Sequence, residues 1–152
     1  MYRICALLPA LCLWTAAFGA QPGVKTEVVG GTSTELPAKS TVRMDYSSAE
    51  GLIFRTAKTE YRVSYQKVNT LEYGQNVSRR YAAAVFISPI LLLSKQRKHF
   101  VTLGYVDADG KQQVVVLRVE KGDIRAVLAG LEARTGRRVE FQDDEARKAG
   151  KG

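Results

Sequence analysis

Apolar and polar residues alternate along much of the chain from residue 41 onward, and this pattern predicts β-strands. In 41–46, for example, Val42, Met44 and Tyr46 share one face, whereas Arg43 and Asp45 face the other way. Similar runs, separated by turns of a few residues, cover 52–56, 60–65 and 68–73. Short strands joined in this way are typical of an antiparallel meander.

A second pair of strands is predicted at 100–106 and 113–119, which are rich in β-branched and aromatic residues. An Asp-Gly pair, Asp109 and Gly110, lies between them. Glycine accepts the positive φ that a tight turn requires, so this sequence predicts a β-hairpin.

The hydrophobic period then changes to that of a helix. Apolar residues recur at i, i+3, i+4 and i+7 and form a single stripe, made of Ile124, Val127, Leu128 and Leu131. Asp123 is expected to cap this helix and Gly136 to end it. Val139 and Phe141 are expected to tuck either a final short strand or a hook under the core. We therefore expect a mainly β, α+β domain of about six or seven antiparallel strands, closed by one C-terminal amphipathic helix.

The two ends of the chain lack a sustained period. Residues 21–40 hold glycines and prolines among serines and threonines and are predicted to be a flexible linker, in which 27–29 adds at most an edge strand. Residues 142–152 are charged, contain no large apolar residue and are predicted to be a disordered tail. The single folded domain is therefore expected to span 41–141.

The first twenty residues have the pattern of an export signal. Arg3 is followed by an apolar core of about eleven residues and then by small residues at 17–20. The core is roughly half the length of a membrane-spanning helix, so we expect cleavage and a periplasmic or extracellular protein. Cys5 and Cys12 both lie in this segment, which leaves the mature domain without a disulfide or a thiolate.

The chain is basic, with 23 Lys and Arg against 15 Asp and Glu and a formal net charge of +8. Basic charge favours polyanionic partners. Export disfavours nucleic acid and favours anionic lipid headgroups or cell-envelope polymers. The alternative is that the charge serves solubility alone.

The most apolar stretch of the mature chain is 81–93 (YAAAVFISPILLL), with cations on both sides. It is too short to cross a bilayer as a helix, and Pro89 interrupts any single element. It either fills the core between sheet and helix, contacts another protein, or inserts shallowly into a membrane while the cations bind anionic headgroups. The candidate contact residues are Arg79, Arg80, Lys95, Arg97, Lys98, Phe86 and Leu92.

Other groups carry weaker signals for chemistry. His99 is the only histidine, and no nucleophile or base is near it in sequence, which disfavours catalysis. Asp107 and Asp109 are interpreted as turn residues, because the later ligands of a calcium loop do not follow. Five tyrosines at strand spacing either line a pocket or, as is more common, pack in the sheet with their hydroxyls at the rim, namely Tyr61, Tyr65, Tyr73, Tyr81 and Tyr105. We expect no cofactor, no metal and no enzymatic activity.

The order of meander, hairpin and closing helix resembles a pleckstrin-homology-like domain of the bacterial or GRAM-like type. Residues 63–73 (VSYQKVNTLEY) carry the resemblance, together with 99–119 and the helix that ends at Gly136. The pieces 71–75, 94–100 and 131–136 also resemble a group of uncharacterised exported bacterial proteins.

The resemblance implies a partly open barrel that serves as a binding scaffold and not as an enzyme. Two features depart from the family: the chain has an export signal, and its apolar insert at 79–98 exceeds an ordinary loop. Inositol-lipid specificity does not carry over, because 47–51, taken as the loop between the first two strands, has no cation. The hypotheses are a module that docks on an anionic membrane or envelope surface through 79–98, or an adaptor for another exported protein with 81–93 buried as core.

Overall fold

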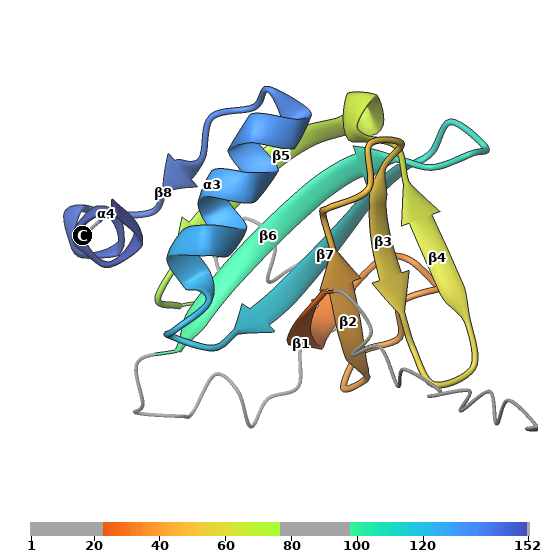
Figure 1. Cartoon of the computed structure of the whole chain (residues 1–152), viewed down its shortest axis with the longest axis horizontal. Helices are drawn as coiled ribbons and strands as arrows, with labels where there is room; N and C mark the ends of the chain where they lie inside the picture. Colours follow the sequence, from red (N-terminus) through yellow and green to blue (C-terminus); the bar gives the residue numbers. More distant parts are fainter. Residues whose placement is uncertain (1–22, 77–97, 152) are drawn as a thin grey trace, which may run out of the picture.

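The computed structural model describes residues 23–76 and 98–151, which form one eight-stranded, mostly antiparallel sheet with two helices (Figure 1). The strand order is β4-β3-β2-β1-β7-β6-β5-β8. The strands are β1 (Val24–Gly31), β2 (Thr41–Asp45), β3 (Leu52–Arg55), β4 (Glu60–Val63), β5 (Val68–Gly74), β6 (His99–Val106), β7 (Gln112–Val119) and β8 (Glu140–Phe141). The helices are α3 (Ile124–Thr135) and α4 (Asp144–Lys151), and a 3-10 turn spans Tyr65–Lys67.

The mainly β prediction is confirmed. The alternating runs form strands β2 to β5 with bounds close to those expected, and the predicted hairpin is β6–β7, with Gly110 at φ 79° in its turn. The short strand expected near Phe141 is β8, which pairs in parallel with β5.

The predicted linker at 21–40 is wrong, because Val24–Gly31 forms β1 in the middle of the sheet. This strand pairs with β2 on one side and with β7 on the other. Val28 and Val29 have no exposed surface, and Leu36 in the following loop is 1% exposed. The backbone pairing on both sides and the burial of these side chains outweigh the turn-like composition of the segment.

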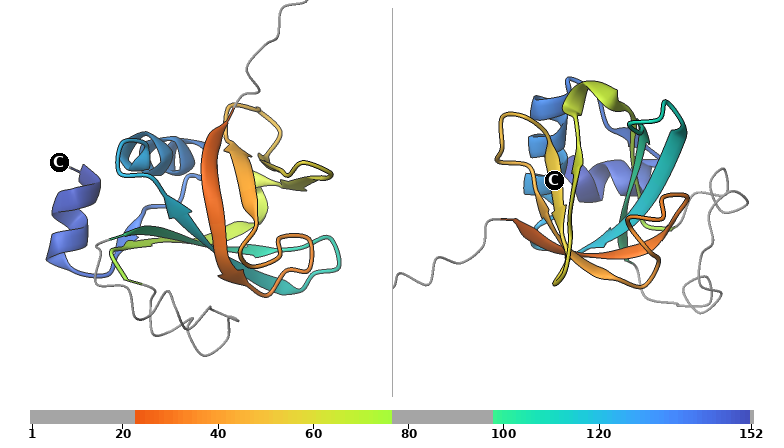
Figure 2. Two further views of the ribbon diagram at one scale, coloured as in Figure 1. Left: turned by 90° about the horizontal axis from the view of Figure 1, so that it is seen from below. Right: turned by 90° about the vertical axis from the view of Figure 1, so that its right-hand side faces the viewer.

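The sheet curls around its concave face (Figure 2). Strands β4 and β5 are six places apart in the sheet order, which is roughly 29 Å in a flat sheet. The chain from Val63 to Val68 spans at most about 18 Å. The short connection through the 3-10 turn therefore requires a strongly bent sheet.

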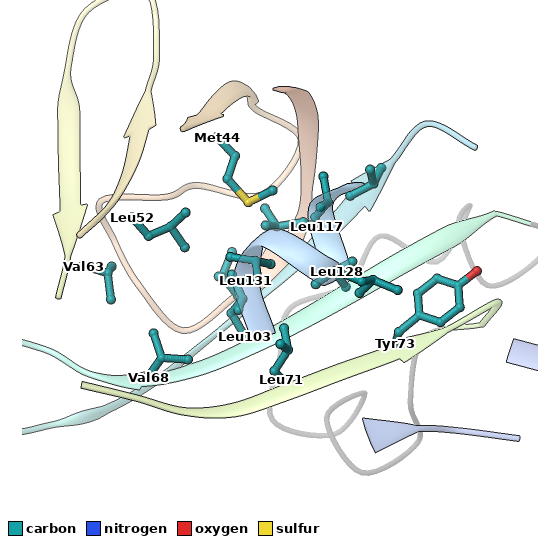
Figure 3. Close-up of a cluster of buried hydrophobic side chains, with 14 of the residues drawn as sticks. Met44, Leu52, Val63, Val68, Leu71, Tyr73, Leu103, Leu117, Leu128 and Leu131 are labelled. Atoms are coloured by element: carbon teal, nitrogen blue, oxygen red, sulfur yellow. The ribbon is translucent and has the colours of Figure 1, made fainter. Parts of the chain in front are cut away.

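Helix α3 covers the concave face as predicted. Its apolar stripe is buried, with Leu131 at 0% and Leu128 at 4% exposure, among side chains from strands on both halves of the sheet such as Met44, Leu71 and Leu117 (Figure 3). These residues form the core of the domain.

The C-terminal end of α3 matches the prediction, and the N-terminal end does not. Gly136 ends the helix at φ 67°, in the left-handed region, as expected. Asp123 stands at the N-cap position, but its side chain makes no capping hydrogen bond, so that part of the prediction is wrong.

The predicted disordered tail is also wrong over Asp144–Lys151, which forms α4. The Asp143 carboxylate accepts a 2.6 Å hydrogen bond from the amide of Ala146 in the first turn. Ala146 is fully buried, and Gly150 packs so closely that a Cβ there would lie 2.7 Å from the ring of Phe141. The contact is made by small residues, so the lack of large apolar residues in 142–152 does not indicate disorder.

Candidate functional site

Most of the predicted contact residues lie outside the part of the chain that the structure describes. Lys98 is described, and it is partly exposed immediately before β6. The others fall within 77–97: Arg79, Arg80, Phe86, Leu92, Lys95 and Arg97.

The structure does describe the base from which that segment leaves and to which it returns. Strands β5 and β6 are antiparallel neighbours, and Gly74 pairs with Phe100. The last described residue before the segment, Asn76, is two positions beyond this pair, and Lys98 is two positions before it. The strand pairing therefore places the described residues that flank the segment, Asn76 and Lys98, at the same end of the sheet.

A tyrosine–histidine pair occupies the same end of the sheet. The Tyr73 hydroxyl and Nδ1 of His99 share a 2.5 Å hydrogen bond, and the two rings are nearly parallel at 6.0 Å between centroids. Phe141 of β8 packs edge-on against Tyr73 at 6.0 Å. Figure 3 shows the Tyr73 hydroxyl pointing away from the core side chains drawn with it. The contacts fix His99 at the start of β6.

The surroundings of His99 favour its neutral form. Burial lowers the pKa of His99, and the positive charge of Lys121 lowers it further, while Glu120 acts in the opposite direction. Tyr73 is the only hydrogen-bond partner that His99 has among the described residues. Tyr73 orients the ring of His99, but a general base also needs a reacting group within reach, and the described side chains give the ring no second hydrogen-bond partner.

A cluster of charged side chains links strands β2, β3 and β4 in the other half of the sheet. Arg55 donates to Asp45 at 2.8 Å and to Glu60 at 2.9 Å, and Asp45 also accepts from the amide and hydroxyl of Ser47. These bonds, with that from Arg55 the largest effect, lower the pKa of Asp45 to about 2. Asp45 shares the outer face with Arg43 in the sequence pattern, yet it is only 3% exposed, because these partners cover it.

The tyrosines lie deeper than expected. Tyr73 and Tyr105 are 0% and 1% exposed, so the prediction of hydroxyls at the rim is wrong for them. The Tyr65 hydroxyl contacts the carbonyl oxygens of Tyr46 and Ser48, each at 3.0 Å. The Tyr105 hydroxyl is buried, and burial raises the pKa of Tyr105 well above its usual range, while the side chains of Ser33 and Tyr61 also act on it.

The turn between β6 and β7 bears out the interpretation of Asp107. Its carboxylate accepts from the amide of Lys111 at 2.8 Å and from the side chain of Gln113 at 2.8 Å.

Within 23–76 and 98–151, no cluster of three histidine, cysteine or acidic side chains is arranged to hold a metal ion.

No protein-family model matches the chain, and no curated protein matches it at a significant level. In the described ranges, none of the helices has the length and apolar character that crossing a bilayer requires. The described residues form a mainly β domain with a curled sheet and helix α3 over its concave face.

Proposed function

We propose that this protein is an exported, non-catalytic binding module that docks on an anionic membrane or envelope surface through the basic-flanked apolar segment 79–98. The observation that carries the proposal is the pairing of Gly74 with Phe100. The two groups of cations begin only a few residues from this pair, one on each side of the apolar stretch. The described residues on either side of the segment, Asn76 and Lys98, therefore belong to one end of the domain.

The electrostatics of the described residues at that end support the proposal. Lys121 is exposed and Lys98 partly exposed, and the positive charge of Lys121 acts on His99. A cation near an anionic membrane surface contributes on the order of 1 kcal/mol to binding. Five flanking cations, assisted by shallow insertion of Phe86 and Leu92, are sufficient for reversible attachment.

We also propose that the scaffold is a pleckstrin-homology-like domain. Seven antiparallel strands, β1 to β7, followed by a helix over the concave face support this proposal, although β1 was not among the strands on which the resemblance rests. The loop between the first two strands is 32–40 and not 47–51, because β1 precedes β2. Lys39 is its only cation, so inositol-lipid specificity is not part of the proposal.

An adaptor domain for another exported protein, with 81–93 buried as core, is the second candidate. It is favoured by Phe100 and Val116, which lie on the face of the sheet opposite α3. They are 4% and 0% exposed, so this face also holds apolar side chains that are shielded from solvent.

Liposome co-sedimentation tests the proposal. The mature chain is mixed with phosphatidylglycerol vesicles and with phosphatidylcholine vesicles, and we expect binding to the former that weakens as salt increases. The test variant has glutamine at five positions: Arg79, Arg80, Lys95, Arg97 and Lys98. We expect it to lose most of the binding.

A matched control separates local attachment from net charge. It has glutamine at five exposed cations elsewhere on the domain: Lys39, Lys58, Lys111, Arg125 and Arg138. Unchanged binding of the test variant, or equal losses in both variants, would remove the proposed docking segment. Replacing Phe86 and Leu92 by serine distinguishes the second candidate, because a large drop in the unfolding midpoint indicates that they are core.

A further inference from the structure

Three cations occupy neighbouring positions on the face of the sheet opposite α3. In the strand register, Lys25 of β1 pairs with Arg43 of β2, and Arg43 pairs with Arg55 of β3. Val42 and Met44, which flank Arg43 in β2, are buried in the core, so the cations project from the other face. Like charges at directly opposite positions of paired strands destabilise a sheet, so this row is unfavourable unless anions compensate it.

A cavity of about 340 Å³ lies over the row of cations. Besides the three cations, Thr41, Thr56 and Ala57 line it, and no acidic residue is among the described residues of its wall. Lys25, Thr41 and Arg43 are exposed, so a ligand in the solvent can reach them. The cavity is therefore an accessible site with a positive charge.

The charge of Arg55 is compensated within the sheet. Its guanidinium donates to Asp45 at 2.8 Å and to Glu60 at 2.9 Å. A ligand would have to compete with these two carboxylates for Arg55. The positive charge that the cavity offers to a ligand therefore comes from Lys25 and Arg43.

The side chains of Lys25, Arg43 and Thr41 supply donors to the cavity. Among the described residues, the Lys25 ammonium and the Thr41 hydroxyl have no hydrogen-bond or ion-pair partner. Arg43 donates from Nη1 to the carbonyl oxygen of Gly23 at 3.2 Å. A guanidinium has five N–H donors, so Arg43 can keep this contact and donate to a ligand as well.

The adjoining cavity on β1 and β7, of about 350 Å³, has a different character. It shares Lys25 and Thr41 with the first cavity, but Glu27 and Glu120 also line it. Glu27 forms an ion pair with Arg118. Carboxylates repel an anion, so of the two cavities the first favours an anionic ligand.

We propose that the first cavity binds a phosphate group in its doubly charged form, with the Lys25 ammonium and the Arg43 guanidinium as counter-ions and the Thr41 hydroxyl as a further donor. A guanidinium can donate two parallel hydrogen bonds to phosphate oxygens, and an ammonium acts beside it as a point charge. A bound dianion also offsets the repulsion between Lys25 and Arg43. None of these residues lies in 79–98 or in the loop 32–40, so the proposal is independent of membrane docking.

Calorimetric titration and amide chemical shifts of the mature chain test the proposal at pH 8 and constant ionic strength. The probes are inorganic phosphate and glycerol 3-phosphate, which carry two charges at this pH, and dimethyl phosphate, which carries one. We expect inorganic phosphate to bind with a Kd of about 1 mM or below and dimethyl phosphate to bind about tenfold more weakly. The shifted amides should include those of Lys25 and Arg43.

The outcomes separate the possible sources of the phosphate group. Binding of inorganic phosphate without glycerol 3-phosphate supports the proposal with the free ion as the ligand, and binding of both supports it with a phosphate monoester as the ligand. Binding of neither dianion, or equal binding of dimethyl phosphate, would overturn the proposal.

Two variants connect binding to the named residues. Lys25→Gln is expected to weaken phosphate binding about tenfold, because a charge-assisted hydrogen bond is lost, and Arg43→Gln to weaken it at least as much. The control is Lys148→Gln, which removes the same charge at an exposed position of α4 and is expected to leave the Kd unchanged. Unaltered affinity in Lys25→Gln, or an equal loss in Lys148→Gln, contradicts the proposed contact.

The stability of the phosphate-free protein supplies an independent readout. Lys25→Gln relieves the repulsion with Arg43, so at low salt we expect its thermal unfolding midpoint to rise by more than that of Lys148→Gln, while its affinity for phosphate falls. A residue with a purely structural role would not show these opposite changes. A lower midpoint would mean that the ammonium stabilises the fold through a contact of its own, and the proposal would then fail.

Discussion

Replacing Asp45 by asparagine removes the carboxylate that Arg55 contacts between β2 and β3. The substitution preserves the size of the side chain and one oxygen that can still accept from Ser47. It removes the negative charge that sits next to a guanidinium in a site where the Asp45 side chain is only 5% exposed. The variant therefore isolates the contribution of ionisation.

The magnitude follows from the lowered pKa. In the folded protein the pKa of Asp45 is about 2, against an ordinary value of 3.8. This difference corresponds to about 2 kcal/mol of stability at neutral pH. Because the folded pKa is depressed, the contribution is complete above about pH 5 and is lost as the pH falls. By linkage, about 1 kcal/mol remains at pH 3 and little remains at pH 2.

The assay is urea unfolding of the wild type and the Asp45→Asn variant at several pH values between 7 and 2.5. We expect the variant to be less stable by about 2 kcal/mol at pH 7 and the two curves to converge as the pH falls. Asp109→Asn, which neutralises an exposed carboxylate, is the control and should follow the wild type. A difference between the wild type and Asp45→Asn that stays constant from pH 7 to pH 2.5 would refute the reasoning.

Three further substitutions test helix α3 and the surroundings of His99. Leu131→Ala leaves a cavity at a fully buried position and should lower the free energy of unfolding by about 2–5 kcal/mol in urea titrations; a loss below this range would mean that the core collapses into the space. Gly136→Ala places a Cβ at φ 67°, where no other atom is within 4 Å, so the backbone conformation alone should cost about 1 kcal/mol. Thermal unfolding checks this value, and an unchanged midpoint would contradict it. Lys121→Glu replaces a cation that lowers the pKa of His99 and should raise that pKa in an NMR titration of the imidazole ring; a fall would contradict the electrostatic assignment.

The parts of the fold that the sequence predicts well are those in which one face of an element is buried and the other is not. The stripe of α3 that ends at Leu131 and the alternation around Met44 have this character, and both lie where expected. The Asp-Gly turn at Gly110 is equally local, because its signal depends on backbone conformation alone. In these cases short-range pattern and long-range packing agree.

The misplaced parts depend on partners far away in sequence. Val28 and Val29 stand next to two glycines, and their burial in β1 requires β7, which lies about ninety residues later. The buried position of Asp45 depends on Arg55 in the next strand. The burial of Tyr105 depends on side chains such as Tyr61 in β4, more than forty residues earlier, and has no local signal.

The central place of β1 has a consequence for folding and for handling of the protein. Because the first strand pairs with both β2 and β7, the sheet cannot be completed until the hairpin that contains β7 has been synthesised. Removing Val24–Gly31 would divide the sheet into two halves and leave two long strand edges open to intermolecular pairing. An N-terminal fusion or protease site must therefore end before Gly23.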